Sequence, residues 1–207
     1  MKFRPTKSSG RFNFQNEGSF ELFVHMEADP DTLSYAEFSF EMTLKDHRFR
    51  SFSGITAYLL RHTAGLFVIA IDSPRSHATH RFQSLWREAD HALTRKGIWL
   101  FATTCENLRQ EPLWSNALEI TRAAQAEEIA PADRALIVEF LSIAGRAPLR
   151  ECARLCDSSS DSYDAVLKLV SAGTLQLAED GPLSAATLLC LCSSPDPGTR
   201  SISIGDS

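Results

Sequence analysis

The stretch "LFVIAIDSPR", residues 66–75, decides the fold of this chain. Phe67, Val68, Ile69 and Ile71 are aromatic or β-branched, and such residues favour the central strand of a sheet. Pro74 lies just beyond the apolar run and indicates a turn. The stretch therefore predicts a buried strand that runs out to a turn.

The segments around this strand predict one α/β unit that closes near residue 125. Apolar residues recur with the helical period in some stretches and alternate in others. Turn residues, and Gly97 as a C-cap, mark where helices end. The expected elements are, in chain order, a short amphipathic helix within residues 19–32, strands over 33–44, 47–61 and 64–72, an amphipathic helix over 80–97, a strand over 98–104 and a helix within 106–125.

Residues 126–192 differ in kind and predict a winged helix-turn-helix domain. Helix starts are marked by Pro131 and by capping residues, helix ends by glycines, and the turn residues "EDGP" predict a hairpin. Three helices followed by a hairpin are the elements of this domain type. The expected helices cover residues 131–145, 148–156 and part of 157–173, and the expected hairpin covers residues 174–189.

The composition is that of an ordinary globular protein. Of 207 residues, 43% are hydrophobic and 23% are charged, and the net charge of -5 provides no general attraction for polyanions. An odd number of cysteines, five, favours reduced thiols. The start "MKFRPTKSSGRFNF" lacks the apolar core of a signal peptide, and no run reaches about 18 apolar residues, so we expect a soluble, cytoplasmic protein without membrane association.

Three phrases that occur in a fixed order resemble the TnsA family, the endonuclease subunit of heteromeric transposases. They are a helix running into "MEADPDTLSYAEFSF", a strand ending in "FVIAIDSP", and "LWREADHALTRKGIWLFATTCENLRQEPLWSNALEITR". The resemblance covers roughly residues 14–125 and the general architecture of 126–190. The positions that carry it in the third phrase are Gly97, Thr104, Glu106, Arg109, Leu113 and Asn116.

The resemblance implies a fold class and a division into segments. The fold expected is α/β, a restriction-endonuclease-like mixed sheet flanked by helices and followed by a winged helix-turn-helix domain. The expected segments are a flexible basic arm at residues 1–13, the endonuclease-like domain at 14–125, the winged-helix domain at 126–192 and a disordered polar tail at 193–207.

The resemblance also locates the family's active-site positions, and none of them keeps a catalytic group. The family's helix glutamate corresponds to Ser19, its aspartate to Gly54, and the Gln or Glu and the Lys of its third strand to Ala70 and Asp72. Glu21 lies two residues beyond Ser19, about 200° around a helix, so it is expected to point away. We therefore expect no catalytic residue, no bound metal and no cofactor.

The leading interpretation is a non-catalytic, TnsA-like component of a DNA transposition or mobile-element complex. One alternative is an active endonuclease with a relocated acidic site, in which Asp72 shares magnesium (Mg2+) with Glu37, Glu41 or Glu21. Another is a stand-alone DNA-binding or interaction protein of a phage or mobile element. The sequence leaves the oligomeric state open.

Basic residues in the first unit are candidates for contacts with DNA phosphates. They are dispersed, so ordinary surface charge is an equally good explanation. The DNA-binding residues expected from this pattern are Arg75, Arg81, Arg87 and Lys96, with Arg61 and Arg95 nearby in the sequence.

The third helix of the C-terminal domain favours protein docking over DNA readout. Its start carries Asp157, Asp161 and Asp164, which would repel a phosphate backbone, and its basic residue is Lys168. Arg150 and Arg154 precede it, and these two arginines with Asp161, Asp164 and Lys168 are the expected partner-binding residues. The resembled family contacts a regulatory ATPase through this domain, so the expected partners are DNA, a transposase subunit and such an ATPase. The apolar residues 166, 167, 169 and 170 are expected to face Leu136, Ile137, Phe140 and Leu141 of the first helix.

Overall fold

The structure, a computed structural model, describes residues 5–8, 14, 17–39, 41–43, 49–51, 56–71, 80–157 and 161–192. The described residues form two compact units. The first, the sheet unit, is built mainly from Lys7–Phe23 and Asp31–Arg109, and the second, the helical unit, mainly from Val24–Pro30 and Gln110–Ser201.

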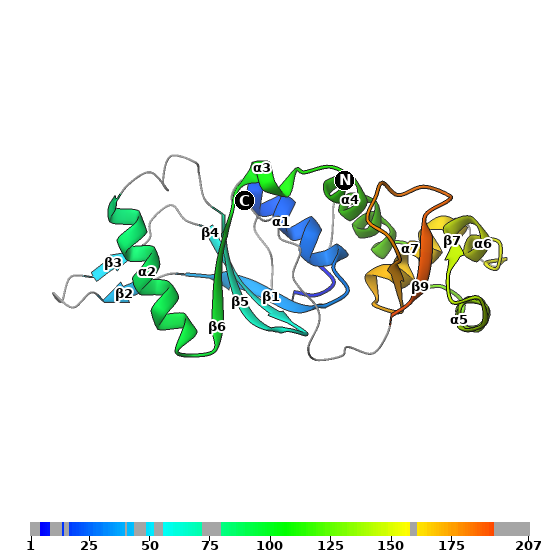
Figure 1. The fold of residues 1–207 in the computed structure, drawn as a ribbon, viewed down its shortest axis with the longest axis horizontal. Helices are drawn as coiled ribbons and strands as arrows, with labels where there is room; N and C mark the ends of the chain where they lie inside the picture. Colours follow the sequence, from blue (N-terminus) through cyan, green and yellow to red (C-terminus); the bar gives the residue numbers. More distant parts are fainter. Residues whose placement is uncertain are drawn as a thin grey trace. The chain divides into compact units, whose positions relative to one another are not determined.

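The sheet unit contains a mixed four-stranded sheet in the order β1-β4-β5-β6. Strand β4 is antiparallel to both β1 and β5, whereas β5 and β6 are parallel and are joined by helix α2 (Figure 1). The fold is therefore α/β, with helices flanking a mixed sheet, and is compatible with a nuclease-like core. The strands are β1 Thr32–Phe38, β4 Thr56–His62, β5 Gly65–Ile71 and β6 Ile98–Thr103. The helices are α2 His80–Thr94, α3 Cys105–Leu108 and the first part of α1 Glu17–Ala28, whose residues from Val24 onward belong to the helical unit.

Strand β5 is the buried strand that its sequence predicts. All five residues from Phe67 to Ile71 are buried, and β5 pairs with β4 on one side and with β6 on the other. Gly65 provides the positive φ, 139°, at the tight β4–β5 connection. The prediction of a central strand from this stretch is confirmed.

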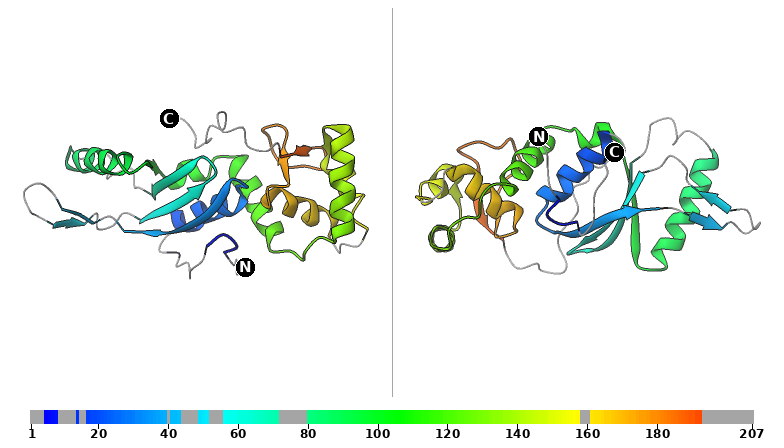
Figure 2. Two further views of the ribbon diagram at one scale, coloured as in Figure 1. Left: turned by 90° about the horizontal axis from the view of Figure 1, so that it is seen from below. Right: turned by 180° about the vertical axis from the view of Figure 1, so that it is seen from behind.

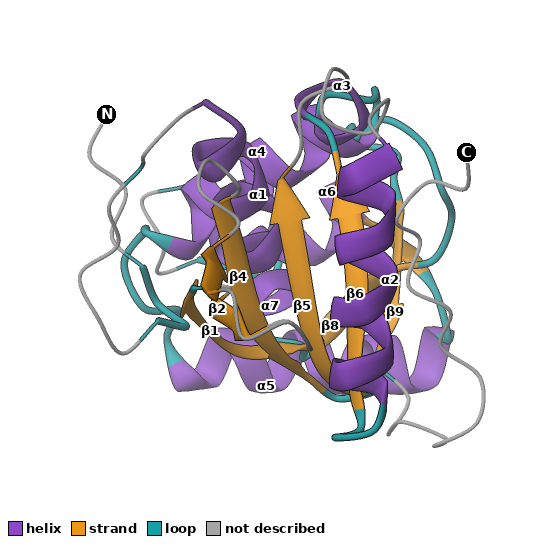
Figure 3. Cartoon of the chain, turned by 90° about the vertical axis from the view of Figure 1, so that its left-hand side faces the viewer, coloured by secondary structure: helices purple, strands orange, loops and turns teal. Residues whose placement is uncertain are grey.

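The two faces of the sheet bury different sets of side chains. Ala57, Val68 and Ala70 form a cluster against which Trp86 and Leu93 of α2 pack. Because successive strand residues point to opposite faces, Tyr58 and Ile69 belong to the other face, where α1 lies (Figure 3). The buried residues of β5 are thus divided between the two faces of the sheet.

Three expectations for the sheet unit differ from the structure. The strands expected over 33–44 and 47–61 are each interrupted, and their inner parts, β2 Glu41–Thr43 and β3 Phe49–Ser51, form a separate antiparallel pair. Helix α2 ends at Thr94, and Gly97, with φ of 72°, lies in the following turn. Helix α1 is not amphipathic, because most of its residues are buried on every side, including Ser19, Glu21 and Glu27.

The described part of the helical unit combines helices α4 to α7 and the second part of α1 with a small antiparallel sheet in the order β7-β9-β8. Pro131 begins α5, Gly145 follows its last residue with φ of 73°, and Asp161 caps α7, as predicted. Among the described helices, none is both long enough and apolar enough to span a bilayer. The elements are α4 Leu113–Ala124, α5 Pro131–Ala144, α6 Leu149–Ala153, α7 Ser162–Ser171, β7 Ala147–Pro148, β8 Leu175–Leu177 and β9 Leu188–Leu191.

The packing of α7 differs from the expectation. Helix α7 packs against α4, α6 and β8, while α5 packs against β9, an arrangement visible in Figure 2. The expected contact between the apolar side of α7 and α5 is therefore not the main one, and Leu136 of α5 is 50% exposed. The expectation was wrong because α4, which precedes the predicted domain, supplies the apolar surface that α7 needs.

Two buried thiols make the stability of the helical unit depend on alkaline pH. Burial raises the pKa of Cys152 and of Cys156 from the ordinary 9.0 to about 11. The unfolded chain therefore releases these protons at lower pH than the folded chain, so the free energy of unfolding should fall as pH rises from about 9 to about 11. Chemical denaturation at several pH values should give a steeper decline for the wild type than for a Cys152→Ala, Cys156→Ala double variant. Equal declines would contradict this assignment.

Candidate functional site

Ser19, the first of the resembled active-site positions, lies on α1 and is fully buried. Its side chain lies beside the Tyr58 phenol of β4. Burial raises the pKa of Tyr58, the neighbouring Ser19 hydroxyl opposes this, and the charge of Glu37 adds to it. Ser19 therefore packs α1 onto one face of the sheet and offers no charge to a cation.

Ala70, the third position, faces the opposite side of the sheet. It is fully buried in the cluster with Ala57 and Val68, under Trp86 of α2. Its partner in the register is Ala57, whereas the Ser19 contact is to the neighbouring residue, Tyr58. The structure thus does not bring the first and third positions together in one pocket. The other two positions, Gly54 and Asp72, lie outside the described residues.

Glu21, which was expected to point away from the Ser19 position, is buried and pairs with Arg109. Its carboxylate is buried on the α1 side, where Oε1 accepts a hydrogen bond from Nε of Arg109, whose side chain is half exposed. The other oxygen, Oε2, is buried without a hydrogen-bond partner among the described residues, as is Oγ1 of Thr103 at the end of β6. Burial, and then the charge of Glu21, raise the pKa of the Cys105 thiol, while Arg109 lowers it.

The cluster formed by Glu21, Thr103, Cys105 and Arg109 is a poor site for a divalent cation. One oxygen of its single carboxylate is engaged by a guanidinium, whose positive charge opposes a metal ion at the same place. Divalent cations of the magnesium type need several oxygen ligands. Within the described ranges, Glu21 belongs to no group of three His, Cys, Asp or Glu ligands close enough to share an ion.

Several residues that carry the family resemblance have structural partners. Thr104 caps α3 by accepting a hydrogen bond from the backbone N–H of Asn107, at 3.2 Å. Asn116 of α4 is buried and bonds twice to the β8–β9 connection, donating to the Gly181 carbonyl at 2.7 Å and accepting from the Leu183 N–H at 2.8 Å. These side chains fix the path of the backbone within their own units, which is a sufficient physical role for them.

The Glu21–Arg109 pair generates a prediction about stability. Replacing Arg109 by Leu leaves a buried carboxylate without its partner, whereas replacing Glu21 by Gln removes the buried charge. We expect Arg109→Leu to lower the free energy of unfolding by about 2 kcal/mol, since water reaches the exposed side of Arg109 and softens the full penalty of a buried charge. Glu21→Gln should cost less. Urea denaturation of the two variants checks this, and an equal or larger cost for Glu21→Gln would contradict it.

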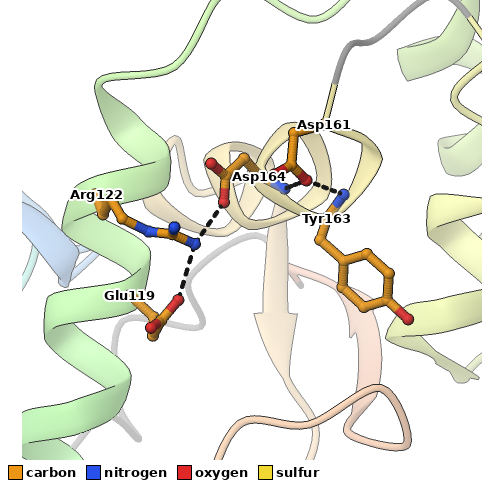
Figure 4. Close-up of polar contacts among 5 residues, drawn as sticks. All are labelled: Glu119, Arg122, Asp161, Tyr163 and Asp164. Carbon is orange, nitrogen blue, oxygen red and sulfur yellow. Dashed lines mark hydrogen bonds and ion pairs between the residues drawn. The ribbon is translucent and has the colours of Figure 1, made fainter.

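The acidic residues at the start of α7 are engaged within the helical unit. Asp161 caps the helix, accepting hydrogen bonds from the N–H groups of Tyr163 and Asp164 at 3.1 and 3.2 Å. Asp164 forms an ion pair of 2.9 Å with Arg122 of α4, which also contacts Glu119 at 3.0 Å (Figure 4). Burial raises the pKa of Asp164, and Arg122 offsets this only in part.

The other expected partner-binding residues divide into engaged and exposed groups. Lys168 donates to the Ala126 carbonyl at 2.7 Å and pairs with Glu128 at 3.0 Å. Arg150 and Arg154 of the α6 region are exposed. A change of charge at Asp161, Asp164 or Lys168 would thus disturb the fold of the unit, so Arg150 and Arg154 are the better probes of a docking surface.

The two aspartates of α7 should differ in their contribution to stability. Asp161→Ala removes an N-cap, which typically costs about 1 kcal/mol. Asp164→Asn should lower the free energy of unfolding by less. The cost of burying the Asp164 carboxylate cancels much of its attraction to half-exposed Arg122. Thermal or urea unfolding of both variants measures the difference. A larger loss for Asp164→Asn would show that the ion pair, and not the cap, holds the start of α7.

The expected DNA-binding residues are only partly described. Arg87 of α2 and Lys96 of the following turn are exposed. Arg81 lies in the first turn of α2, but its side chain, like the whole of Arg75, is outside the described part. Arg87 and Lys96 are therefore the candidates whose surroundings are described and that can be tested by substitution.

No protein-family model matches the sequence, and no curated protein matches it in a sequence comparison.

Proposed function

We propose that this chain is a cytoplasmic, non-catalytic, TnsA-like component of a DNA transposition or mobile-element complex, which acts by binding DNA ends and protein partners. In this proposal the sheet unit is a restriction-endonuclease-like core without catalytic groups, and residues 126–192 form a winged-helix domain. The partners are a transposase subunit and a regulatory ATPase.

The observation that carries the proposal is the placement of Ser19 and Ala70. Both are fully buried, they face opposite sides of the sheet, and neither has a charge. An enzyme that hydrolyses phosphodiesters with metal ions needs several oxygen ligands converging on one open place. A binding role requires only exposed groups on a stable scaffold, and Arg87 and Lys96 meet that requirement for phosphates.

The composition of the helical unit supports docking to protein rather than reading of DNA. The start of α7, which would enter a groove in a DNA-reading winged helix, presents Asp161 and Asp164. Their carboxylates are directed to backbone N–H groups and to Arg122, yet they keep this end of the helix electronegative. The exposed Arg150 and Arg154 offer paired guanidinium groups to an acidic partner surface.

Two matched double variants test whether the sheet unit binds DNA and the helical unit binds the protein partners. Arg87→Ala with Lys96→Ala should weaken DNA binding by the full chain and reduce the slope of log affinity against log salt by about one unit for each phosphate that is no longer neutralised. Arg150→Ala with Arg154→Ala should leave DNA binding unchanged and weaken binding to the transposase or ATPase. Fluorescence anisotropy with duplex DNA and pull-down with purified partners give the two readouts, and each variant is the control for the other.

Opposite results would reject the proposal. If the Arg150, Arg154 variant loses DNA binding with a smaller salt slope, the helical unit is the DNA reader. If the full chain binds neither DNA nor these partners, the alternative of a stand-alone interaction protein is left.

A further inference from the structure

One end of the four-stranded sheet gathers exposed apolar and exposed basic side chains. It is the end at which β4 turns into β5 and α2 turns into β6 (Figure 3). Leu66 and Trp99 lie there and are 38% and 56% exposed. Three exposed bases belong to the same end: Arg61, Arg95 and Lys96. We call these five residues the basic end of the sheet.

The register of the sheet brings the strand residues of the basic end to one level. Arg61 pairs with Leu66 across β4 and β5. Leu66 pairs with Ile98, the residue before Trp99, across β5 and β6. Neighbouring strands lie about 4.8 Å apart, so the backbone at Arg61 is about 10 Å from the start of β6.

The turn between α2 and β6 adds the other two bases. The Gly97 N–H donates to the Thr94 carbonyl at 2.9 Å, and Gly97 has a positive φ of 72°. The chain therefore reverses within a few residues, and Arg95 and Lys96 lie next to the first residues of β6. All five side chains of the basic end are thus within reach of one extended ligand.

Trp99 is a large aromatic ring presented to solvent by a well-packed strand. It pairs in register with buried Phe67, so its side chain leaves the sheet on the α1 face. Phe67 packs against the rings of His62 and Phe101, each at a centroid distance of 5.7 Å. The neighbours of Trp99 in the sheet are therefore fixed, while more than half of its own surface is open to a ligand.

Acidic groups near the basic end do not cancel its charge. Asp31 is half-buried, and its Oδ1 accepts a hydrogen bond from Oγ1 of Thr63 at 3.1 Å. Asp90 is exposed but lies on α2, more than one turn before Arg95. Around the basic end the charge is thus positive, although the whole chain has a net charge of -5.

We propose that the basic end binds single-stranded DNA. One unpaired base stacks on the Trp99 indole, and the phosphates on either side of it contact the Arg61, Arg95 and Lys96 side chains. Aromatic stacking and neutralisation of phosphates are the two components of single-strand binding. The inference rests on the proposed function for its ligand, DNA, and adds the form of the DNA and the place where it binds.

The exposed ring is the reason to name a single strand and not a duplex. Inside a duplex the faces of each base are covered by the bases above and below, so an indole has no face on which to stack. An unpaired base offers its face, and this contact tolerates any sequence. An acidic protein segment would match the three bases, but it would leave Trp99 without a stacking partner.

Fluorescence anisotropy of the full chain with labelled oligothymidine, and with a duplex of equal length, tests the stacking contact. Trp99→Leu keeps an apolar side chain but removes the ring. It should raise the dissociation constant for the single strand about tenfold, the effect of one lost stacked base, and leave duplex binding unchanged. Trp99→Phe keeps a ring and should restore most of the affinity. The matched control is Tyr163→Leu, an aromatic residue of the helical unit that is 40% exposed, and it should change neither affinity.

The phosphate contacts have their own readout. Arg61→Ala with Arg95→Ala should reduce the slope of log affinity against log salt for the single strand by about 0.7 for each contact that is lost. These two residues differ from the pair that tests duplex binding. Arg150→Ala with Arg154→Ala removes the same charge from the helical unit and should leave the slope unchanged.

Failure of this inference and failure of the proposed function give different results. Duplex binding without single-strand binding, or single-strand binding that Trp99→Leu leaves intact, overturns the inference and leaves the proposed function standing. An equal loss of both forms of DNA in Trp99→Leu also overturns it. Single-strand binding that depends on Trp99, without duplex binding, supports the inference and removes the proposed binding of duplex ends. Binding of an acidic peptide but of no DNA overturns the inference.

Discussion

The two-sided burial of β5 is the constraint on which the rest of the sheet unit depends. This strand lies between β4 and β6, and its residues from Phe67 to Ile71 are buried on both faces. A slip of one residue would move Val68 and Ala70 from the α2 side to the α1 side and reverse every neighbour. The register is therefore strongly specified, and it determines which residues of the family-like pattern can meet.

That constraint explains why Ser19 and Ala70, at two positions where the resembled family has catalytic groups, do not meet in one pocket. Ala70 is buried where α2 packs on the sheet, and Ser19 is buried where α1 lies against Tyr58. A buried carboxylate of α1, Glu21, is engaged by Arg109. The polar side chains on this side of the sheet serve to attach elements to one another, and the groups available for binding are exposed ones.

Some features were predictable because they depend on local chemistry. The apolar run of β5, the start of α5 at Pro131 and the cap of α7 at Asp161 follow from the preferences of single residues or short runs. The interruption between β1 and β2 was missed, because alternation of apolar residues continues across the point where the chain leaves the sheet. The burial of Glu21 and the pairing of Asp164 with Arg122 were also missed, since both partners lie far away in the sequence.

The packing of the C-terminal helices shows the same limit of prediction from sequence. The apolar side of α7 was evident from the sequence, but its partner was not, because α4 and α5 both offer apolar residues at helical spacing. The acidic start of α7 was equally evident, whereas its engagement by backbone N–H groups and Arg122 required the structure. Charge at a helix start can therefore indicate a cap as readily as a binding surface.

The measurement that tests the central claim most directly is the conversion of supercoiled plasmid DNA by the full chain in the presence of magnesium or manganese. Ser19 and Ala70 are buried on opposite faces, and Arg109 engages Glu21. The account therefore predicts no nicked or linear product at any protein concentration. Metal-dependent cleavage that Glu21→Gln abolishes would contradict it and would establish an active acidic site.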